Sequence, residues 1–124
     1  MAIVLIADDD PMILRLLEVS LTAAGHSVVL AEDGREALDL VTQEDPDILL
    51  LDGMMPELTG LEVLEALKND DTTKDMPVVL MTALTEREEI DKGLDLGATE
   101  YVVKPFAPKD MITIVNRLTK EILV

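Results

Sequence analysis

Side chains that could bind a ligand or take part in a reaction lie at the ends of four of the five short apolar runs in this chain. Asp8 and Asp9 follow the run at 2–7, and Asp52 follows the run at 47–51. Two later runs end on Thr82 and Lys104. In an open parallel sheet, ligands bind in the crevice outside the carboxyl ends of the strands. If the runs are parallel strands, three carboxylates, a hydroxyl and an ammonium share one small site.

Three carboxylates in one site repel one another, so the fold must balance them by protonation or by a cation. The chain has no cysteine, and the candidate ligands Asp8, Asp9 and Asp52 offer only oxygen atoms. Oxygen ligands favour a hard cation, and Mg2+ typically combines one or two carboxylates with phosphate oxygens. The sequence therefore predicts a Mg2+ site that receives a phosphoryl group.

Each of these residues also has an ordinary structural explanation when it is taken alone. Acids at 8–10 favour a helix N-terminus because of the helix dipole, and Asp52-Gly53 is typical of a turn. Thr82 suits a strand as a β-branched residue, and Lys104 could be a solvated charge. The functional interpretation depends on the whole set.

Amphipathic segments separate the five runs, which cover 2–7, 27–31, 47–51, 77–82 and 99–104. Near-continuous apolar character, as at 48–51, indicates strands covered on both faces, as in a parallel sheet between helices. The first helix begins with the cap Asp10 and with Pro11 at its first position, and Gly25 ends it. Its predicted apolar stripe is Ile13, Leu16, Leu17 and Leu21.

Three further helices are predicted where a side-chain acceptor precedes Glu by three residues, which is the spacing of a capping box. These pairs are Asp33 with Glu36, Thr59 with Glu62, and Thr85 with Glu88. Pro108 opens a fifth helix, whose apolar positions are Met111, Ile112, Val115, Leu118 and Ile122.

The alternating order predicts an α/β fold of the (βα)5 type. We expect a flavodoxin-like three-layer sandwich whose parallel sheet has the strand order 2-1-3-4-5, from right-handed crossovers and one switch point. In that order Asp8, Asp9 and Asp52 meet at the switch point, and Thr82 and Lys104 approach from beyond the third strand.

Composition sets limits on the class of protein. A chain of 124 residues fits one domain, and we predict a single domain over 1–124. With 26 Asp plus Glu against 10 Lys plus Arg, the formal charge of −16 disfavours direct nucleic-acid binding. The N-terminal apolar stretch is too short to cross a bilayer. We therefore expect a soluble, cytoplasmic protein with no membrane segment.

The ordered set of residues resembles the receiver domain of two-component response regulators. Asp9, Asp52, Thr82 and Lys104 follow one another at separations of 43, 30 and 22 residues. Further matching features of the sequence are Asp8, the stretch Asp52-Gly53-Met54-Met55-Pro56, Gly60, Gly97-Ala98, Tyr101 and Lys104-Pro105-Phe106. The resemblance covers essentially the whole chain.

This resemblance implies a role for each matching residue. Asp52 is the phospho-acceptor, and Mg2+ is bound by Asp9, by Asp52, by Asp8 mostly through a water, and by the backbone carbonyl of Met54. Thr82 and Lys104 contact phosphoryl oxygens, and the Lys104–Pro105 peptide bond is cis. Phosphorylation then moves Thr82 and turns Tyr101 inward.

The resemblance also implies partners and a lifetime for the phosphoryl group. The donor is a histidine kinase or a histidine phosphotransfer protein, and the output passes to a downstream protein or to an output domain absent from this chain. The face of the fourth helix, fifth strand and fifth helix carries the change. Met54 and Leu84 occupy the positions that tune the lifetime, and because both are apolar we predict slow dephosphorylation. The domain is expected to act as a switch that assists its own phosphorylation and dephosphorylation, and to be no enzyme in the usual sense.

Other classes remain open at this stage. A metal-dependent phosphatase of the aspartyl-phosphate type usually has a second acid two residues after the nucleophile, where this chain has Met54. A scaffold with a receiver fold normally lacks an acceptor or a metal ligand, and neither is missing here. A flavin carrier needs a phosphate-binding loop instead of three acids, and this chain has only one Tyr, one Phe and no Trp.

Overall fold

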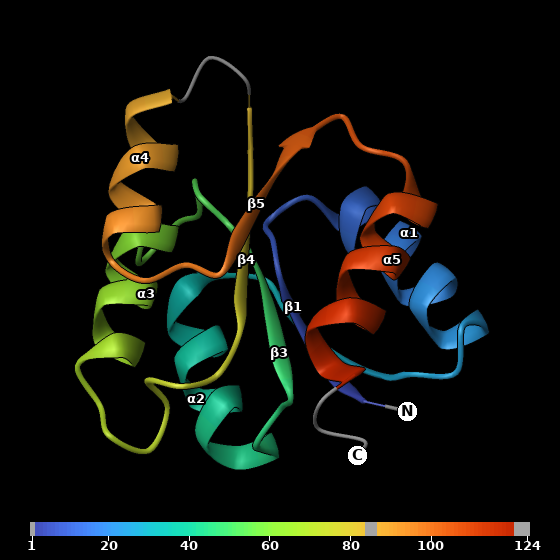
Figure 1. Cartoon of the computed structure of the whole chain (residues 1–124), viewed down its shortest axis with the longest axis horizontal. Coiled ribbons are helices and arrows are strands. Elements are labelled where there is room, and N and C mark those ends of the chain that lie inside the picture. Colours follow the sequence, from blue (N-terminus) through green and yellow to red (C-terminus); the bar gives the residue numbers. More distant parts are fainter. Residues whose placement is uncertain (1, 84–86, 121–124) are drawn as a thin grey trace.

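The computed structural model describes residues 2–83 and 87–120 and consists of one five-stranded parallel sheet between two layers of helices (Figure 1). The strand order is β2-β1-β3-β4-β5. The (βα)5 architecture and the sheet order predicted from the sequence are thus confirmed. The ends of β1 and β3 lie side by side, because these strands are parallel neighbours in the sheet.

The strands are short and regular, and the helices between them are two to four turns long. The strands are β1 (Ile3–Ala7), β2 (Ser27–Ala31), β3 (Ile48–Asp52), β4 (Val78–Ala83) and β5 (Glu100–Lys104). The helices are α1 (Pro11–Ala23), α2 (Gly34–Glu44), α3 (Gly60–Lys68), α4 (Arg87–Asp95) and α5 (Pro108–Thr119). Among the described residues, no helix is both long and apolar enough to cross a bilayer.

The sheet is buried on both faces, as its continuous apolar strands predict. Alternate residues of β3 point to opposite faces: Leu49 and Leu51 pack with α2 and α3, whereas Ile48 and Leu50 pack with α1 and α5. Figure 1 shows α1 and α5 on one side of the sheet and α2, α3 and α4 on the other. Two apolar cores therefore hold the sheet rigid and fix the positions of the strand ends.

The observed strands differ from the predicted ranges by one residue in several places. β3 runs from Ile48 to Asp52, so Asp52 is the last residue of the strand and pairs with Met81 of β4. Asp47, which was predicted to begin this strand, precedes it, and its carboxylate accepts a hydrogen bond from the N–H of Ile3 at 2.8 Å. The backbone that carries the Asp52 side chain is thus held directly by the ladder.

The helix ends follow most of the sequence signals. Asp10 accepts a hydrogen bond from the N–H of Met12 at 2.9 Å, and Gly25 has a φ of +97° at the end of α1. The predicted stripe of α1 was wrong at Leu16, which is 41% exposed, whereas Leu14 is buried. The helix is rotated so that Leu14, Leu17 and Leu21 face the core.

The predicted capping boxes differ in how completely they form. At α3 the box is complete, because Thr59 and Glu62 each accept a hydrogen bond from the N–H of the other. At α2 the Asp33 carboxylate caps the N–H of Glu36, but the Glu36 carboxylate bonds the N–H of Glu32 instead of that of Asp33. The predicted box at Thr85 and the apolar position Ile122 lie outside the described residues.

Candidate functional site

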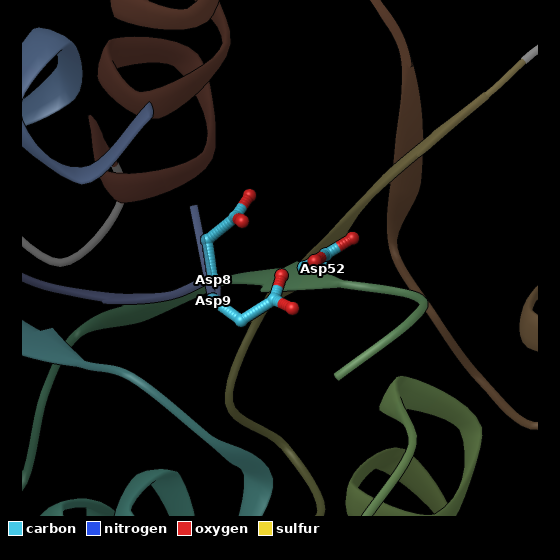
Figure 2. A group of neighbouring side chains, drawn as sticks. All are labelled: Asp8, Asp9 and Asp52. Atoms are coloured by element: carbon cyan, nitrogen blue, oxygen red, sulfur yellow. The ribbon is translucent and has the colours of Figure 1, made fainter. Parts of the chain in front are cut away.

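Three aspartate side chains meet at the carboxyl edge of the sheet. Asp8 and Asp9 directly follow β1, and Asp52 ends the neighbouring strand β3. One carboxylate oxygen from each residue lies within 4.8 Å of the others. Figure 2 shows the three carboxylates gathered beside the ends of these two strands. The convergence predicted from the strand order is therefore present in the structure.

Asp8 is fully buried, and both of its oxygens have partners. Its Oδ1 accepts a hydrogen bond from the backbone N–H of Asp10 at 2.9 Å, and its Oδ2 accepts one from the Lys104 ammonium at 2.8 Å. A buried carboxylate is tolerated only when it is paired and hydrogen-bonded. The loop that follows β1 and the end of β5 together satisfy Asp8.

Lys104 extends from the last position of β5 across the site. Its Nζ lies 2.8 Å from Asp8 Oδ2 and 3.3 Å from Asp52 Oδ1, and its side chain is one-quarter exposed. Burial alone lowers the pKa of Lys104, but the bonds and charges of Asp8 and Asp52 outweigh it and hold that pKa above its ordinary value. The ammonium is therefore a fixed counter-charge. The predicted cis peptide bond at Lys104–Pro105 is confirmed.

Asp52 is nearly buried, with 6% of its surface exposed. Its Oδ1 faces Lys104 and accepts a hydrogen bond from the N–H of Met54 at 3.3 Å. Burial and, after it, repulsion by Asp8 raise the pKa of Asp52 from 3.8 to about 6, although Lys104 and the Met54 N–H act in the opposite direction. The ionised carboxylate of Asp52 is therefore disfavoured by its burial and by Asp8, and positive charge placed beside it favours that form.

At Gly60 the backbone comes very close to the backbone of Asp52 and Gly53, and this contact closes the loop after β3. A Cβ atom at Gly60 would lie 2.4 Å from the carbonyl oxygen of Asp52 and 2.8 Å from Gly53 Cα. The Gly60 N–H donates to the Gly53 carbonyl at 3.0 Å. The sequence drew attention to Gly60 only through the family resemblance. The physical requirement for glycine is space beside the backbone of Asp52, and this requirement becomes visible only in the folded loop.

The remaining predicted residues surround the acids less tightly. Thr82 is buried near the end of β4, and among the described residues the hydrogen-bond partner of its Oγ1 is the Ala83 carbonyl, at 3.5 Å. Tyr101 is half-buried on β5 and packs against the core on the α2 and α3 side. The Met54 side chain is 56% exposed, and Leu84 lies outside the described residues. The structure thus brings Asp8, Asp9, Asp52 and Lys104 together, whereas Thr82 and Tyr101 make no side-chain bond to the acids.

The donor set fits a hard divalent cation. All three candidate ligands are carboxylates, and such oxygen donors suit Mg2+ better than softer metals. The two oxygens of Asp8 are already occupied by Asp10 and Lys104. Asp9, which is exposed, and Asp52 are therefore the residues better placed to bind a cation directly.

The comparisons with known proteins agree with this geometry. The family model of the response regulator receiver domain matches residues 4–116. The chain is 46% identical over 108 residues to the probable transcriptional regulator ycf27 of Guillardia theta, covering 87% of this chain and 41% of that protein. It is 43% identical over 117 residues to the response regulator MprA of Mycolicibacterium vanbaalenii, covering 94% and 50%. The chain thus spans half or less of the length of these curated relatives.

Solved structures of similar size give the same result. The chemotaxis response regulator CheY4 of Vibrio cholerae matches with a TM-score of 0.89 and 35% identity, covering 95% of this chain and 98% of that one. The receiver domain of the Francisella response regulator 1452 matches with a TM-score of 0.89 and 34% identity, covering 98% of both. The fold, the clustered acids with their lysine, and these matches together show that this chain belongs to the response regulator receiver domain family, the phospho-accepting switches of two-component signalling.

Proposed function

We propose that Asp52 is the residue of this switch that accepts the phosphoryl group, from a phosphohistidine of a histidine kinase or of a histidine phosphotransfer protein. The observation that carries the proposal is the position of the Asp52 carboxylate. It ends a buried strand, lies 3.3 Å from the Lys104 ammonium, and shares its surroundings with Asp8 and Asp9. A nucleophile, its counter-charge and two further acids are thus fixed before any donor arrives.

The proposed reaction is a displacement at phosphorus. An oxygen of Asp52 forms a bond to phosphorus, the bond from phosphorus to the donor's imidazole nitrogen breaks, and the nitrogen keeps the electron pair. Phosphoryl transfer relies mainly on positioning and charge stabilisation. An ammonium has three donors, and Asp8 and Asp52 face two of those of Lys104. The third is available for a phosphoryl oxygen, and Thr82 would donate to another.

The residues that would hold Mg2+ are Asp9 and Asp52 through their carboxylates, Asp8 through a water, and Met54 through its backbone carbonyl. The indirect role of Asp8 is supported by its two existing hydrogen bonds. Bound Mg2+ supplies positive charge next to the oxygens of the transferred group. Among this chain's own residues, Asp8 orients Lys104, and the Met54 N–H holds Asp52 Oδ1 in place.

The exposed face of α1 supports a docking site for the donor. Among the described residues, five large apolar side chains are exposed, and three of them, Met12, Leu16 and Val19, lie on α1. Their spacing of four and three residues places them on one helix face. Because α1 begins just after Asp8 and Asp9, a helix lying along this face would bring its phosphohistidine to the acids.

The output is proposed to follow from the added charge. Phosphorylation replaces the single negative charge of the Asp52 carboxylate with the larger charge of a phosphoryl group, about −1.5 to −2, and adds three acceptor oxygens. These oxygens draw the Thr82 hydroxyl toward them and leave space for Tyr101 to turn inward. The face of α4, β5 and α5 then favours a different partner, either a downstream protein or an output domain. We propose that residues 1–124 form a single receiver domain with this role.

The proposed lifetime of the phosphoryl group is long. Met54 and Leu84 carry no group that can orient an attacking water, so the domain's own contribution to dephosphorylation is small. Replacing them with polar residues, Met54→Asn together with Leu84→Glu, is expected to shorten the lifetime of the phosphoprotein in Mg2+ buffer. Decay that is as fast in the wild type as in this double variant would contradict the proposal.

Incubation with acetyl phosphate and Mg2+, followed by intact-mass measurement, tests the acceptor. The wild type should gain the mass of one phosphoryl group, Asp52→Asn should gain none, and the matched control Asp39→Asn, on the exposed face of α2, should behave as the wild type. Labelling of the Asp52→Asn variant, or its absence in folded wild type, would overturn the assignment.

A further inference from the structure

The chain carries its oxidisable sulfur in methionine alone, because it has seven Met and no Cys. Among the described residues, the methionines differ in exposure. Met55, Met81 and Met111 are buried and Met76 is partly buried, whereas Met12 is 79% exposed and Met54 is 56% exposed. Oxidation of a thioether depends on access of the oxidant. Of the described methionines, Met12 and Met54 are therefore the ones that a dissolved oxidant reaches most easily.

Met54 is also attached to the acceptor's immediate surroundings. Its backbone N–H donates to Asp52 Oδ1 at 3.3 Å, so its Cα is fixed two residues beyond the acceptor. The adjacent Met55 points the other way, into the core between the sheet and helices α2 and α3. Of these two consecutive methionines, Met54 thus exposes its side chain to solvent two residues after Asp52, whereas Met55 is inaccessible.

We propose that Met54 is an oxidation site, and that its conversion to the sulfoxide shortens the lifetime of the phosphoryl group on Asp52. The inference rests on the proposed acceptor role of Asp52 and extends it to regulation by peroxides. The proposed modification is reversible, since methionine sulfoxide is a substrate for sulfoxide reductases.

The chemical step requires a peroxide as the oxidant. A lone pair on the Met54 sulfur forms a bond to one peroxide oxygen, the oxygen–oxygen bond breaks, and the other oxygen leaves as water or as an alcohol. The sulfur loses two electrons and the peroxide gains them. The product differs from methionine by one oxygen atom, and this change turns an apolar side chain into a polar one.

The expected consequence follows from the polarity of the new group. The thioether is a weak hydrogen-bond acceptor, so it has no group that would position an attacking water. A sulfoxide oxygen accepts hydrogen bonds strongly and can hold a water next to Asp52. An ordinary hydrogen bond corresponds to a rate factor of about two to ten, and this is the acceleration of dephosphorylation that we expect.

The experiment compares the decay of acetyl-phosphate-labelled protein with and without prior treatment by hydrogen peroxide. The samples are the wild type, Met54→Leu and Met12→Leu, and peptide mass spectrometry locates the sulfoxides. Each protein is compared with its own untreated sample, which removes any direct effect of the substitution. Treated wild type and Met12→Leu should lose the phosphoryl group faster, whereas Met54→Leu should not respond, and a sulfoxide reductase should restore slow decay.

Several results would overturn the inference. One is an equal response of Met54→Leu and the wild type, and another is oxidation of Met12 under conditions that leave Met54 unchanged. Unchanged decay in wild type oxidised at Met54 would do the same. In all three cases the untreated protein still accepts phosphate, so the acceptor role of Asp52 survives. Failure of the untreated wild type to be labelled would instead remove both proposals.

Discussion

Two parts of the site differ in how tightly they are held. We call the part formed by Asp8, Asp9, Asp52, Lys104 and Gly60 the acid side, and the part around Thr82 the Thr82 side. On the acid side, Asp8 is fully buried with both oxygens bonded, and Gly60 holds the loop against the backbone of Asp52. On the other side, within the part of the chain that the structure describes, the Thr82 hydroxyl donates to the Ala83 carbonyl at the limit of hydrogen-bond length. The acid side is organised in advance to hold charge, whereas the Thr82 side has room to rearrange when charge is added.

A small cavity marks the boundary between the two sides. It has a volume of about 10 Å³ and is lined by Gly53, Leu61, Leu80, Thr82, Glu89 and Ile90. Farther along α4 the packing is much closer, because a Cβ at Gly93 would lie 2.1 Å from Leu80 Cδ1. The helix is thus in tight contact at Gly93 and leaves unfilled space one turn earlier, beside Thr82.

The largest expected effect comes from removing the counter-charge of the acid side. Lys104→Met leaves Asp8 buried without its ammonium, and loss of one partner from such a pair should cost about 3 kcal/mol of unfolding free energy in metal-free buffer. Urea unfolding measures this cost, and Lys109→Met, an exposed lysine of α5, is the control. Mg2+ should recover part of the loss. Equal stability of the two variants would show that the acid side is not organised around Lys104.

Gly53 and Gly60, the two glycines that follow Asp52, give the next largest contrast. Gly60→Ala forces a Cβ against the Asp52 carbonyl and should cost about 1–3 kcal/mol, as overpacking usually does. At Gly53 an added Cβ meets nothing closer than 3.9 Å, and Gly53→Ala should be neutral or stabilising by up to about 1 kcal/mol because it restricts the unfolded chain. Thermal unfolding of both variants tests the comparison, and similar melting temperatures would contradict it.

The sequence predicted the geometry of the acid side more completely than that of the Thr82 side. Apolar runs and capping signals predicted the strands and helices, and right-handed crossovers with one switch point predicted the strand order. That order brings Asp8, Asp9 and Asp52 together. The one-residue shift of β3 was missed, since strand ends depend on ladder pairing such as Asp52 with Met81. The outward position of Leu16 was missed because either Leu14 or Leu16 can complete an apolar helix face together with Leu17 and Leu21. Only packing in the folded protein shows that Leu14 is the buried one.

The ionisation of Asp52 gives a smaller effect with a definite sign. Since its pKa rises from 3.8 to about 6 on folding, the folded state binds more protons than the unfolded state between these pH values. Metal-free wild type should therefore lose stability relative to Asp52→Asn as the pH rises from 4 to 6, and the difference should level off above that. Urea unfolding at several pH values measures it. A stability difference that is constant with pH would indicate that burial and Asp8 do not raise the pKa of Asp52.

Asp9 is exposed, so its repulsion by the other acids is screened and its effect should be smaller still. Asp9→Asn is expected to stabilise the metal-free protein by a few tenths of a kcal/mol, up to about 1 kcal/mol. Mg2+ should raise the melting temperature of the wild type more than that of the variant, because ligand binding to the folded state stabilises it. Calorimetry with and without Mg2+ checks both points, and a melting temperature indifferent to both changes would count against a shared cation site.

The smallest effect on stability is expected at Thr82, where the effect on signalling should be large. Thr82→Val keeps the shape of the side chain and removes only a hydroxyl bonded at 3.5 Å, so the unfolding free energy should change by less than about 0.5 kcal/mol. The variant should still be labelled at Asp52. However, NMR shifts of Tyr101 and of the α4 and β5 face should no longer follow phosphorylation, because no hydroxyl moves toward the new oxygens. A loss of more than about 2 kcal/mol of unfolding free energy would mean that the Thr82 hydroxyl is held by strong hydrogen bonds, as Asp8 is. The small cavity beside Thr82 would then have no role in the switch.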